Sequence, residues 1–299
     1  MSADVHLARR PTPDTPSPPD GDGRAPWLLG PALIVVALAV LVVVGAWAVI
    51  LTQPTTTLPG LGVTWQRSVD FGRDLLGVDS VGTPAYADRA AWGEVLPLAV
   101  DTVVMSVLAV GLAAVGALAT IGYSSRLLTV GEFGTHPRLA WPLYLLSRSM
   151  HIVARSVPDV VWALLIVFLV RPGILAGALA LALHDSGVLG RLGSDVVDNL
   201  DRGPLRNLRA AGAGRVAMVA YGVLPQALPR LVTFLLYRWE VIVRATVVVG
   251  FITTAGLGYQ LRLDLAFRRW TDVALVLLVY VVLVWGVDAL SSALRRLAR

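Results

Sequence analysis

Arginine is the residue type with the clearest chemical consequences in this sequence. All 25 basic residues are arginine, and the chain contains neither lysine nor cysteine. Without lysine it cannot carry the phosphate-binding lysine of a P-loop NTPase or form a lysine Schiff base. Without cysteine it has no disulfide, thiol nucleophile or thiolate metal site. The four histidines show no metal-ligand spacing. We therefore expect no metal, no cofactor and none of these catalytic chemistries.

A basic segment, residues 203–229, lies between two apolar stretches and reads GPLRNLRAAGAGRVAMVAYGVLPQALP. It contains Arg206, Arg209 and Arg215, and Arg202 comes just before it. A sequence that only anchors a chain in a membrane would be apolar. A short basic helix between two apolar stretches has the form of a docking element for a soluble partner. An ordinary basic loop is the alternative interpretation.

The spacing within this segment predicts a short helix over residues 203–217. Leu205 and Leu208 are three positions apart and fall on one helical face. Gly212 favours a turn out of the helix, because glycine adopts backbone conformations that other residues avoid. Leu224-Pro225 is expected to stop the chain's next helical turn, since proline lacks the N–H that a helix interior needs.

Three charged residues, Arg238, Glu240 and Arg244, lie inside the apolar run 231–251. An unpaired charge at the centre of a membrane span costs roughly 2.5–3.5 kcal/mol on insertion scales, so each charge needs a partner or a function. Glu240 and Arg244 are four positions apart, and we expect them to neutralise each other. Arg238 lies on a different face without a local partner, which makes it the better candidate for meeting an anion.

A second polar group lies in the preceding apolar region. Arg155 and Asp159 are also four positions apart, but Pro158 distorts the turn between them, so their pairing stays open. His184-Asp185 is either a proton relay, half of a metal site, or a polar helix end packed against a neighbour. The candidate residues for a substrate path are therefore Arg155, Asp159, His184, Arg238, Glu240 and Arg244.

The elements that must position these residues are membrane helices. The 299-residue chain is 56% hydrophobic and 15% charged, with a mean hydropathy of +0.71, whereas a soluble domain carries roughly 25% charged residues. A bilayer core of about 30 Å takes about 20 helical residues. We predict an all-α polytopic membrane protein with about six spans, at 27–52, 94–123, 141–170, 174–199, 231–251 and 270–290.

The chain divides into three parts. Residues 1–26 hold six prolines and few large apolar groups, so we expect a disordered cytoplasmic tail. Residues 27–92 comprise the first span and an external loop with one amphipathic turn at most. Residues 93–299 form the transmembrane core, in which 124–137 is a short hydrophilic loop.

Two features of this core point to a transport path. The apolar runs between residues 139 and 183 are short and interrupted by proline or glycine, which is tolerated where helices pack in a bundle or line a cavity. The glycine-rich break at 253–258 is either a flexible turn or, through Gly256 and Gly258, an external gate.

Arginine distribution predicts the orientation of the chain. With the N-terminus inside, the inner segments hold thirteen arginines and the outer segments hold seven, as the positive-inside rule favours. Both termini and the segment 203–229 are then cytoplasmic. The formal net charge of +5 suits loops beside anionic lipid and needs no nucleic acid to explain it.

The segment 203–229 resembles the EAA loop, the cytoplasmic coupling loop of ABC importer permeases. That pattern is Glu-Ala-Ala, three residues, Gly, nine residues, Ile-x-Leu-Pro. Gly212 takes the glycine position, nine residues separate it from Gly222 at the isoleucine position, and Leu224-Pro225 completes the pattern. The residues at the Glu-Ala-Ala positions are 206–208, so Arg206 stands where the loop typically has an acid.

From about residue 140 to the end, the chain resembles phosphonate-type permeases within that superfamily. The matching segments are RSVPDVVWAL (155–164), LAGALALALH (175–184), YGVLPQ (221–226), YRWEVIVR (237–244) and GFITTAGLG (250–258).

The resemblance implies a type I ABC importer permease fold and a non-catalytic transport subunit of the cell membrane. The implied partners are cytoplasmic ATPases, an external solute-binding protein and a second permease, either an identical copy or a paired one. The implied substrate is phosphonate or a related oxyanion, phosphate or phosphite. Alternatives are a permease for another small solute such as methionine, a secondary transporter or channel, and a membrane-embedded enzyme. The residues expected to couple to the ATPase are Leu205, Arg206, Leu208, Arg209, Gly212, Leu224 and Pro225.

Overall fold

The computed structural model describes residues 29–52, 61–78, 82–134 and 137–297. All regular structure in these ranges is helical, which confirms the all-α prediction. The chain forms two compact units, Met1–Trp65 and Gln66–Arg299. The predicted tail, residues 1–26, lies outside the described ranges.

The first unit contains one long apolar helix, α1 (Leu29–Thr52). Its sequence carries no charge, and its 24 residues extend about 36 Å at 1.5 Å per residue. That length exceeds a bilayer core of about 30 Å. The first predicted span is therefore present as a continuous helix.

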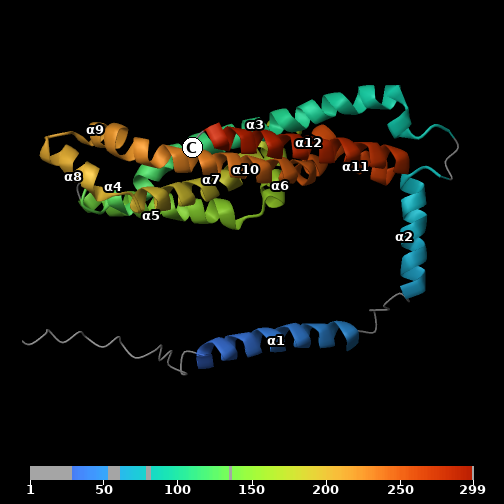
Figure 1. Ribbon diagram of the computed structural model, residues 1–299, viewed down its shortest axis with the longest axis horizontal. Coiled ribbons are helices and arrows are strands. Elements are labelled where there is room, and N and C mark those ends of the chain that lie inside the picture. The colour runs from blue at the N-terminus through green and yellow to red at the C-terminus, as the bar shows by residue number, and fades with distance from the viewer. Residues whose placement is uncertain (1–28, 53–60, 79–81, 135–136, 298–299) are drawn as a thin grey trace, which may run out of the picture. The chain divides into compact units, whose positions relative to one another are not determined.

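The second unit is a helical bundle, and Figure 1 shows α4, α8 and α9 at one of its ends and α11 at the opposite end. The helix α2 (Leu61–Leu75) begins in the first unit. The remaining helices are η2 (Ala85–Ala87), α3 (Arg89–Ser124), α4 (Arg126–Thr129), α5 (Pro137–Ser156), α6 (Asp159–Leu169), α7 (Ile174–Asp198), α8 (Arg202–Ala210), α9 (Arg215–Ala217), the π-helical turn η3 (Met218–Val223), α10 (Leu224–Thr253), α11 (Gly256–Ala266) and α12 (Trp270–Leu297).

Four helices of the described chain, α1, α3, α7 and α12, are each long and apolar enough to cross a membrane. Two further helix pairs qualify jointly but are bent, by 98° between α5 and α6 and by 57° at the break before α11. The predicted six spans are reached when each bent pair counts as one.

The prediction of one continuous helix over 141–170 is wrong. α5 ends at Ser156 and α6 begins at Asp159. Pro158 explains the break, because its ring disfavours helical geometry in the preceding residue and it has no N–H to donate. Pro158 itself has an extended ψ of 148° and stands directly before α6.

The glycine-rich break before α11 is confirmed, but the helix that follows it was not predicted. Thr254 adopts a left-handed backbone with φ of 53°, and Gly256 one with φ of 62°. The hydroxyl of Thr102 on α3 accepts a hydrogen bond from the Leu257 N–H at 2.9 Å, which satisfies a donor in the first turn of α11. The break is therefore held by a neighbouring helix.

Two segments predicted as loops contain helices. The external loop includes α2, whose 15 residues far exceed one amphipathic turn, and Phe71 on α2 makes an edge contact with Trp270 at 5.4 Å between ring centroids. The supposed hydrophilic loop 124–137 includes α4 and buries Leu127, Leu128 and Phe133. The large apolar residues of this otherwise polar segment thus pack inside the protein instead of lying on an exposed loop.

Helix α7 lies at the centre of the bundle and packs against α3, α5, α6 and α10. Its glycines allow close approach: a Cβ on Gly187 would lie 2.8 Å from the Cβ of Ala154, and one on Gly190 would lie 2.3 Å from Nε2 of His151. Small residues at helix crossings let backbones meet in this way.

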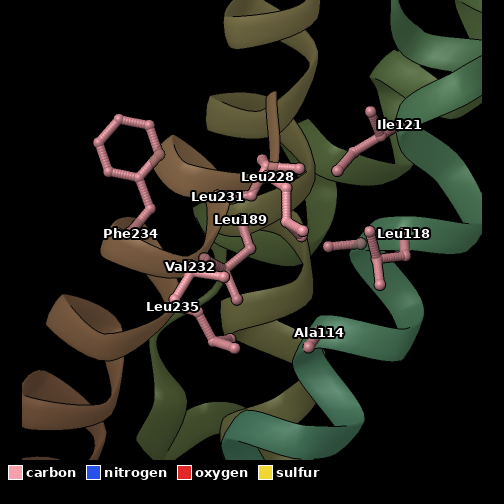
Figure 2. A pocket seen from close by; sticks show the side chains of 10 residues that line it. Ala114, Leu118, Ile121, Leu189, Leu228, Leu231, Val232, Phe234 and Leu235 are labelled. Atoms are coloured by element: carbon pink, nitrogen blue, oxygen red, sulfur yellow. The ribbon is translucent and has the colours of Figure 1, made fainter. Parts of the chain in front are cut away.

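Figure 2 shows an apolar pocket where α3, α7 and α10 meet. Its volume is about 110 Å³, and only alanine, leucine, isoleucine, valine and phenylalanine side chains line it. Because none of these side chains donates a hydrogen bond, this pocket cannot recognise an anion.

Candidate functional site

Helix α8 forms the centre of the predicted docking segment and is shorter than predicted. The Asp201 carboxylate caps its start by accepting a hydrogen bond from the Gly203 N–H at 3.0 Å. It ends at Ala210, and Gly212 follows with a left-handed φ of 81°. The Ala213 N–H then donates to the Leu208 carbonyl at 3.0 Å. This is the glycine-based helix stop of a Schellman motif, as the sequence predicted for Gly212.

The apolar face of α8 packs against its own chain. Leu205 is fully buried, and Leu208 contacts the same core cluster. Both face Gly222 of η3, where an added Cβ would lie 2.5 Å from Cδ2 of Leu205 and 3.1 Å from Cδ1 of Leu208. Leu205 therefore anchors α8 to the bundle and leaves the polar side of the helix exposed.

The Arg206 guanidinium forms a two-point ion pair with Glu132. Its Nε lies 2.9 Å from one carboxylate oxygen and a terminal nitrogen lies 3.0 Å from the other. The hydrogen bond from Arg206 lowers the pKa of Glu132 below its ordinary value, with further contributions from the charges of Arg202 and Arg209. The carboxylate in turn raises the pKa of Arg206. Glu132 stays ionised at neutral pH.

Two more arginines of the segment contact residues 125–134, which we call the α4 segment. Arg209 donates to the backbone carbonyl of Glu132, and its guanidinium lies over the Phe133 ring at 5.7 Å. Arg215 donates to the Leu128 carbonyl at 2.7 Å. All three contacts join the basic segment to one short stretch of chain.

The α4 segment is also tied to the end of α7. The Asp198 carboxylate accepts hydrogen bonds from the Ser125 hydroxyl at 2.6 Å and from the Leu127 N–H at 3.0 Å. The α4 segment therefore bridges α7 and α8. The sequence interpretation missed Glu132 and Asp198, although an acid within a basic stretch was a usable signal for the first.

The prediction that Leu224-Pro225 stops a helix is wrong. The turn η3 leads directly into α10, and Leu224 and Pro225 form the first turn of that helix. Proline is compatible with a helix start, where its missing N–H would have no intrahelical partner. The wider π-helical turn before it also relaxes the crowding that a proline ring causes.

Arg238, predicted to lack a local partner, is paired across the bundle. Its Nε donates to Oδ1 of Asp185 on α7 at 2.7 Å. The Asp185 side chain is 2% exposed and that of Arg238 is 17% exposed. Pairing offsets the cost of burying both charges, so Arg238 is not a free cation in this structure.

The predicted pair between Glu240 and Arg244 does not form. Each residue pairs with α12 instead: Arg295 donates to Glu240, and Arg244 donates to Asp288 at 2.6 Å. The two helices α10 and α12 are therefore joined by two ion pairs. Glu240 and Arg244 thus connect α10 to α12 instead of pairing within α10.

Asp159 lies beside His184 rather than beside Arg155. Its carboxylate is 3.3 Å from Nδ1 of His184, and the same ring nitrogen is 3.0 Å from the Val157 carbonyl. These contacts join the start of α6 to the middle of α7. The side chain of Arg155 is exposed and forms no ion pair or hydrogen bond with any described residue.

Gly256 and Gly258 are both buried at the break between α10 and α11. A Cβ on Gly258 would lie 2.1 Å from the Val247 carbonyl oxygen, and one on Gly256 would lie 2.5 Å from the Thr102 hydroxyl. The break is thus closely packed in this conformation.

Comparison with known proteins places these features in a family. The family model for binding-protein-dependent transport system inner membrane components matches residues 137–298. The phosphite transport system permease protein PtxC of Stutzerimonas stutzeri is 31% identical over 266 residues, which cover 80% of this chain and 92% of that protein. The putative cryptic phosphonate transport system permease protein of Escherichia coli is 36% identical over 118 residues, 40% of this chain and 97% of that protein.

Among solved structures, an inward-facing conformation of the MetNI methionine ABC transporter is similar in fold. The alignment has a TM-score of 0.61 and 18% sequence identity, and it covers 71% of this chain and 99% of that chain. The chain therefore belongs to the family of binding-protein-dependent transport system inner membrane components and has the type I ABC importer permease fold.

Proposed function

We propose that this chain is the transmembrane permease subunit of an importer for phosphonate or a related phosphorus oxyanion, phosphate or phosphite. A separate ATPase drives the transport, and the chain itself catalyses no reaction. The names of the relatives support the oxyanion class. The methionine transporter resembles this chain at a level that concerns the fold alone, so we favour the oxyanion over methionine.

One observation carries the coupling role: α8 is a short basic helix anchored on one side and exposed on the other. Its apolar face is internal at Leu205, whereas Arg202, Asn207 and Arg209 are exposed. An ATPase that binds this polar side and moves it would displace η3 and α10, because Leu205 packs against Gly222. The residues assigned to coupling are Leu205, Arg206, Leu208, Arg209, Gly212, Leu224 and Pro225.

The orientation follows from the same helix. An element that docks an ATPase must face the cytoplasm, and the arginine distribution favours the same side. The end of the bundle with α4, α8 and α9 is then cytoplasmic, and the end with α11 is external (Figure 1). From the arginine distribution we also propose that both chain termini are cytoplasmic, and we assign residues 93–299 to the permease core.

The remaining partners are an external solute-binding protein and a second permease copy. Helix α6, which follows the bend after α5, leaves large apolar side chains exposed at its far end, among them Phe168 at 87% and Leu169 at 83%. A bend of 98° suits packing against protein at membrane depth better than packing against lipid, because helix breaks need neighbours that satisfy their backbone groups. We assign this surface to the second copy.

Arg155 is the favoured pathway residue. Of the six candidates, it alone has no charged partner among the described residues. The neighbouring Ala154 lines a hollow of about 620 Å³, together with Thr120 and His151, whose Oγ1 and Nε2 lie 2.8 Å apart. We assign Asp159, His184, Arg238, Glu240 and Arg244 to the substrate path as further candidates.

Gly256 and Gly258 are the candidates for a gate at the external end of this path.

Reconstitution tests the proposal. The chain is placed in nanodiscs with the ATPase that copurifies with it, and ATP hydrolysis is measured with binding proteins loaded with phosphite, phosphate, a phosphonate or methionine. We expect stimulation by an oxyanion-loaded binding protein. Stimulation by the methionine-loaded protein alone would refute the substrate assignment.

A further inference from the structure

Glu132 is the acidic residue on which the exposed contacts of α8 converge. Arg206 binds both oxygens of its carboxylate, and Arg209 binds its backbone carbonyl. We call Glu132, Arg206 and Arg209 the Glu132 clamp. In sequence, Glu132 is 74 positions from Arg206, so the clamp joins two distant parts of the chain.

The clamp continues into the bundle through the α4 segment. Asp198, at the end of α7, holds Ser125 and Leu127 at the start of that segment. Leu127 and Leu128 are buried in the same core cluster as Leu205. A displacement of α8 is therefore passed to α7 by two routes, through the apolar core and through the clamp.

The charges of the clamp are complementary. Arg206 stands at the position where the EAA pattern has an acid, and a glutamate there would face Glu132 with like charge. Arg202 and Arg209 also lie close enough to Glu132 to lower the pKa of its carboxyl group. The carboxylate of Glu132 thus attracts three arginines, and reversing its charge would break the ion pair with Arg206 and turn the electrostatic interaction with Arg202 and Arg209 into repulsion.

We propose that Glu132 is a positioning residue for coupling, which holds α8 to the α4 segment so that movement imposed on α8 reaches α7. The inference rests on the proposed coupling function of α8. Both partners are substantially exposed, at 60% for Arg206 and 37% for Glu132. An exposed ion pair contributes little to folding stability, so its loss should spare insertion and ATPase binding and reduce the transmission of movement.

A charge-swap series tests this inference in nanodiscs with the ATPase and loaded binding protein. The variants are Glu132→Arg, Arg206→Glu and the double variant with both changes. Arg126→Glu is the matched control, because Arg126 belongs to the same α4 segment, is exposed and forms no ion pair with a described residue. The readouts are the stimulated and the basal ATPase rate and copurification of the ATPase.

Each single variant should lower the ratio of the stimulated to the basal ATPase rate about fivefold or more. A fivefold change is at the low end of the coupling between sites that is typical of allosteric proteins. Copurification of the ATPase should remain unchanged in Glu132→Arg, because this change leaves the exposed side of α8 intact. The double variant should recover most of the ratio, since it rebuilds the pair with reversed charges. The control should behave as the unmodified chain.

Unchanged stimulation in Glu132→Arg would overturn the inference, and so would failure of the double variant to recover what the single variants lose. A cross-link gives independent evidence, since the chain has no native cysteine. A flexible bifunctional thiol reagent joining Glu132→Cys to Arg206→Cys should preserve stimulation if the two segments move together. Loss of stimulation on cross-linking would contradict the inference.

The experimental result that would refute the proposed function differs from the one that would refute the role of Glu132. If the unmodified chain shows no stimulation with any loaded binding protein, the coupling function itself is refuted. If the unmodified chain is stimulated and the charge-swap series shows no effect, only the role of Glu132 is refuted.

Discussion

Ion pairs between distant residues decide which charged side chains are available for transport. Arg238 has the sequence context of a free cation in a membrane span, yet it binds Asp185 on another helix. Glu240 and Arg244 likewise bind residues of α12 rather than each other. The insertion cost of a membrane charge, roughly 2.5–3.5 kcal/mol, explains why such charges find partners. Arg155 is notable because it does not.

Asp185→Asn should destabilise the bundle strongly. It leaves the Arg238 guanidinium without its carboxylate in a site where the Asp185 side chain is 2% exposed, and removing one partner of a buried pair costs about 3 kcal/mol or more. SDS-induced unfolding in mixed micelles gives the change in the free energy of unfolding. Asp195→Asn is the control: Asp195 is 42% exposed and pairs with Arg191 at 3.0 Å and with Arg148 at 3.5 Å, and losing these pairs should cost about 1 kcal/mol. Equal effects of the two changes would contradict the account.

The Glu132 clamp should be insensitive to pH across the neutral range. Its hydrogen bond with Arg206 lowers the pKa of Glu132 from an ordinary value of 4.5. A lowered carboxyl pKa means that the clamp is present above the ordinary value and is lost only as the pH falls through the lowered one. An NMR titration with ¹³C-labelled glutamate, assigned with Glu132→Gln, should show no titration of Glu132 between pH 8 and about pH 5. A midpoint above the ordinary value would be inconsistent with the clamp.

At the scale of elements, the close contact between α8 and η3 is the feature that links the exposed helix to a span. Gly222 permits it, because any larger residue would collide with Leu205. The EAA pattern has isoleucine at this position, whereas glycine here leaves room for Leu205.

Gly222→Ala should loosen α8. The added Cβ lies 2.5 Å from Cδ2 of Leu205, and overpacking of this kind costs typically about 1–3 kcal/mol. Hydrogen exchange followed by mass spectrometry should show faster exchange of α8 amides in this variant. Gly286→Ala on α12 is the control, since a Cβ there meets nothing within 4 Å. Unchanged exchange of α8 in Gly222→Ala would show that the contact is not needed to hold the helix.

Long apolar runs predicted α1, α3 and α12 well, because membrane thickness fixes how long such a run must be. The sequence indicated that Pro158 interrupts a helix, but it did not indicate the 98° angle between α5 and α6. That angle depends on what the two helices pack against. Helix α11 was missed because its first turn is stabilised by the Thr102 hydroxyl, which is 155 positions away in the sequence. Hydropathy carries no information about such a contact.

In the candidate site too, local features could be predicted from the sequence and contacts between distant residues could not. The glycine turn at Gly212 was predictable, because a local backbone conformation required it. The partners Glu132 and Asp185 were not, because they lie 74 and 53 positions from the arginines they bind. Local spacing suggested Glu240 and Arg244 as a pair, but the helix α12 offered each of them a separate partner.

At the scale of the whole molecule, the second unit combines an internal bundle with two different ends. One end gathers α4, α8 and α9 around arginines and the Glu132 clamp, and the opposite end holds α11 (Figure 1). Such an arrangement suits a subunit that receives movement at one end and transmits it along packed helices to the other. The glycine contacts of α7 make that helix the common element of the bundle.

The central claim is that transport by this chain is driven through α8 by a separate ATPase. Proteoliposomes containing the chain and its copurifying ATPase, with oxyanion-loaded binding protein outside and ATP inside, measure it through uptake of labelled phosphite, phosphate or phosphonate. We predict accumulation that requires ATP and the ATPase and is abolished by Gly212→Asp, which strains a backbone with φ of 81°, while membrane insertion is retained. Uptake that persists without the ATPase would contradict the account.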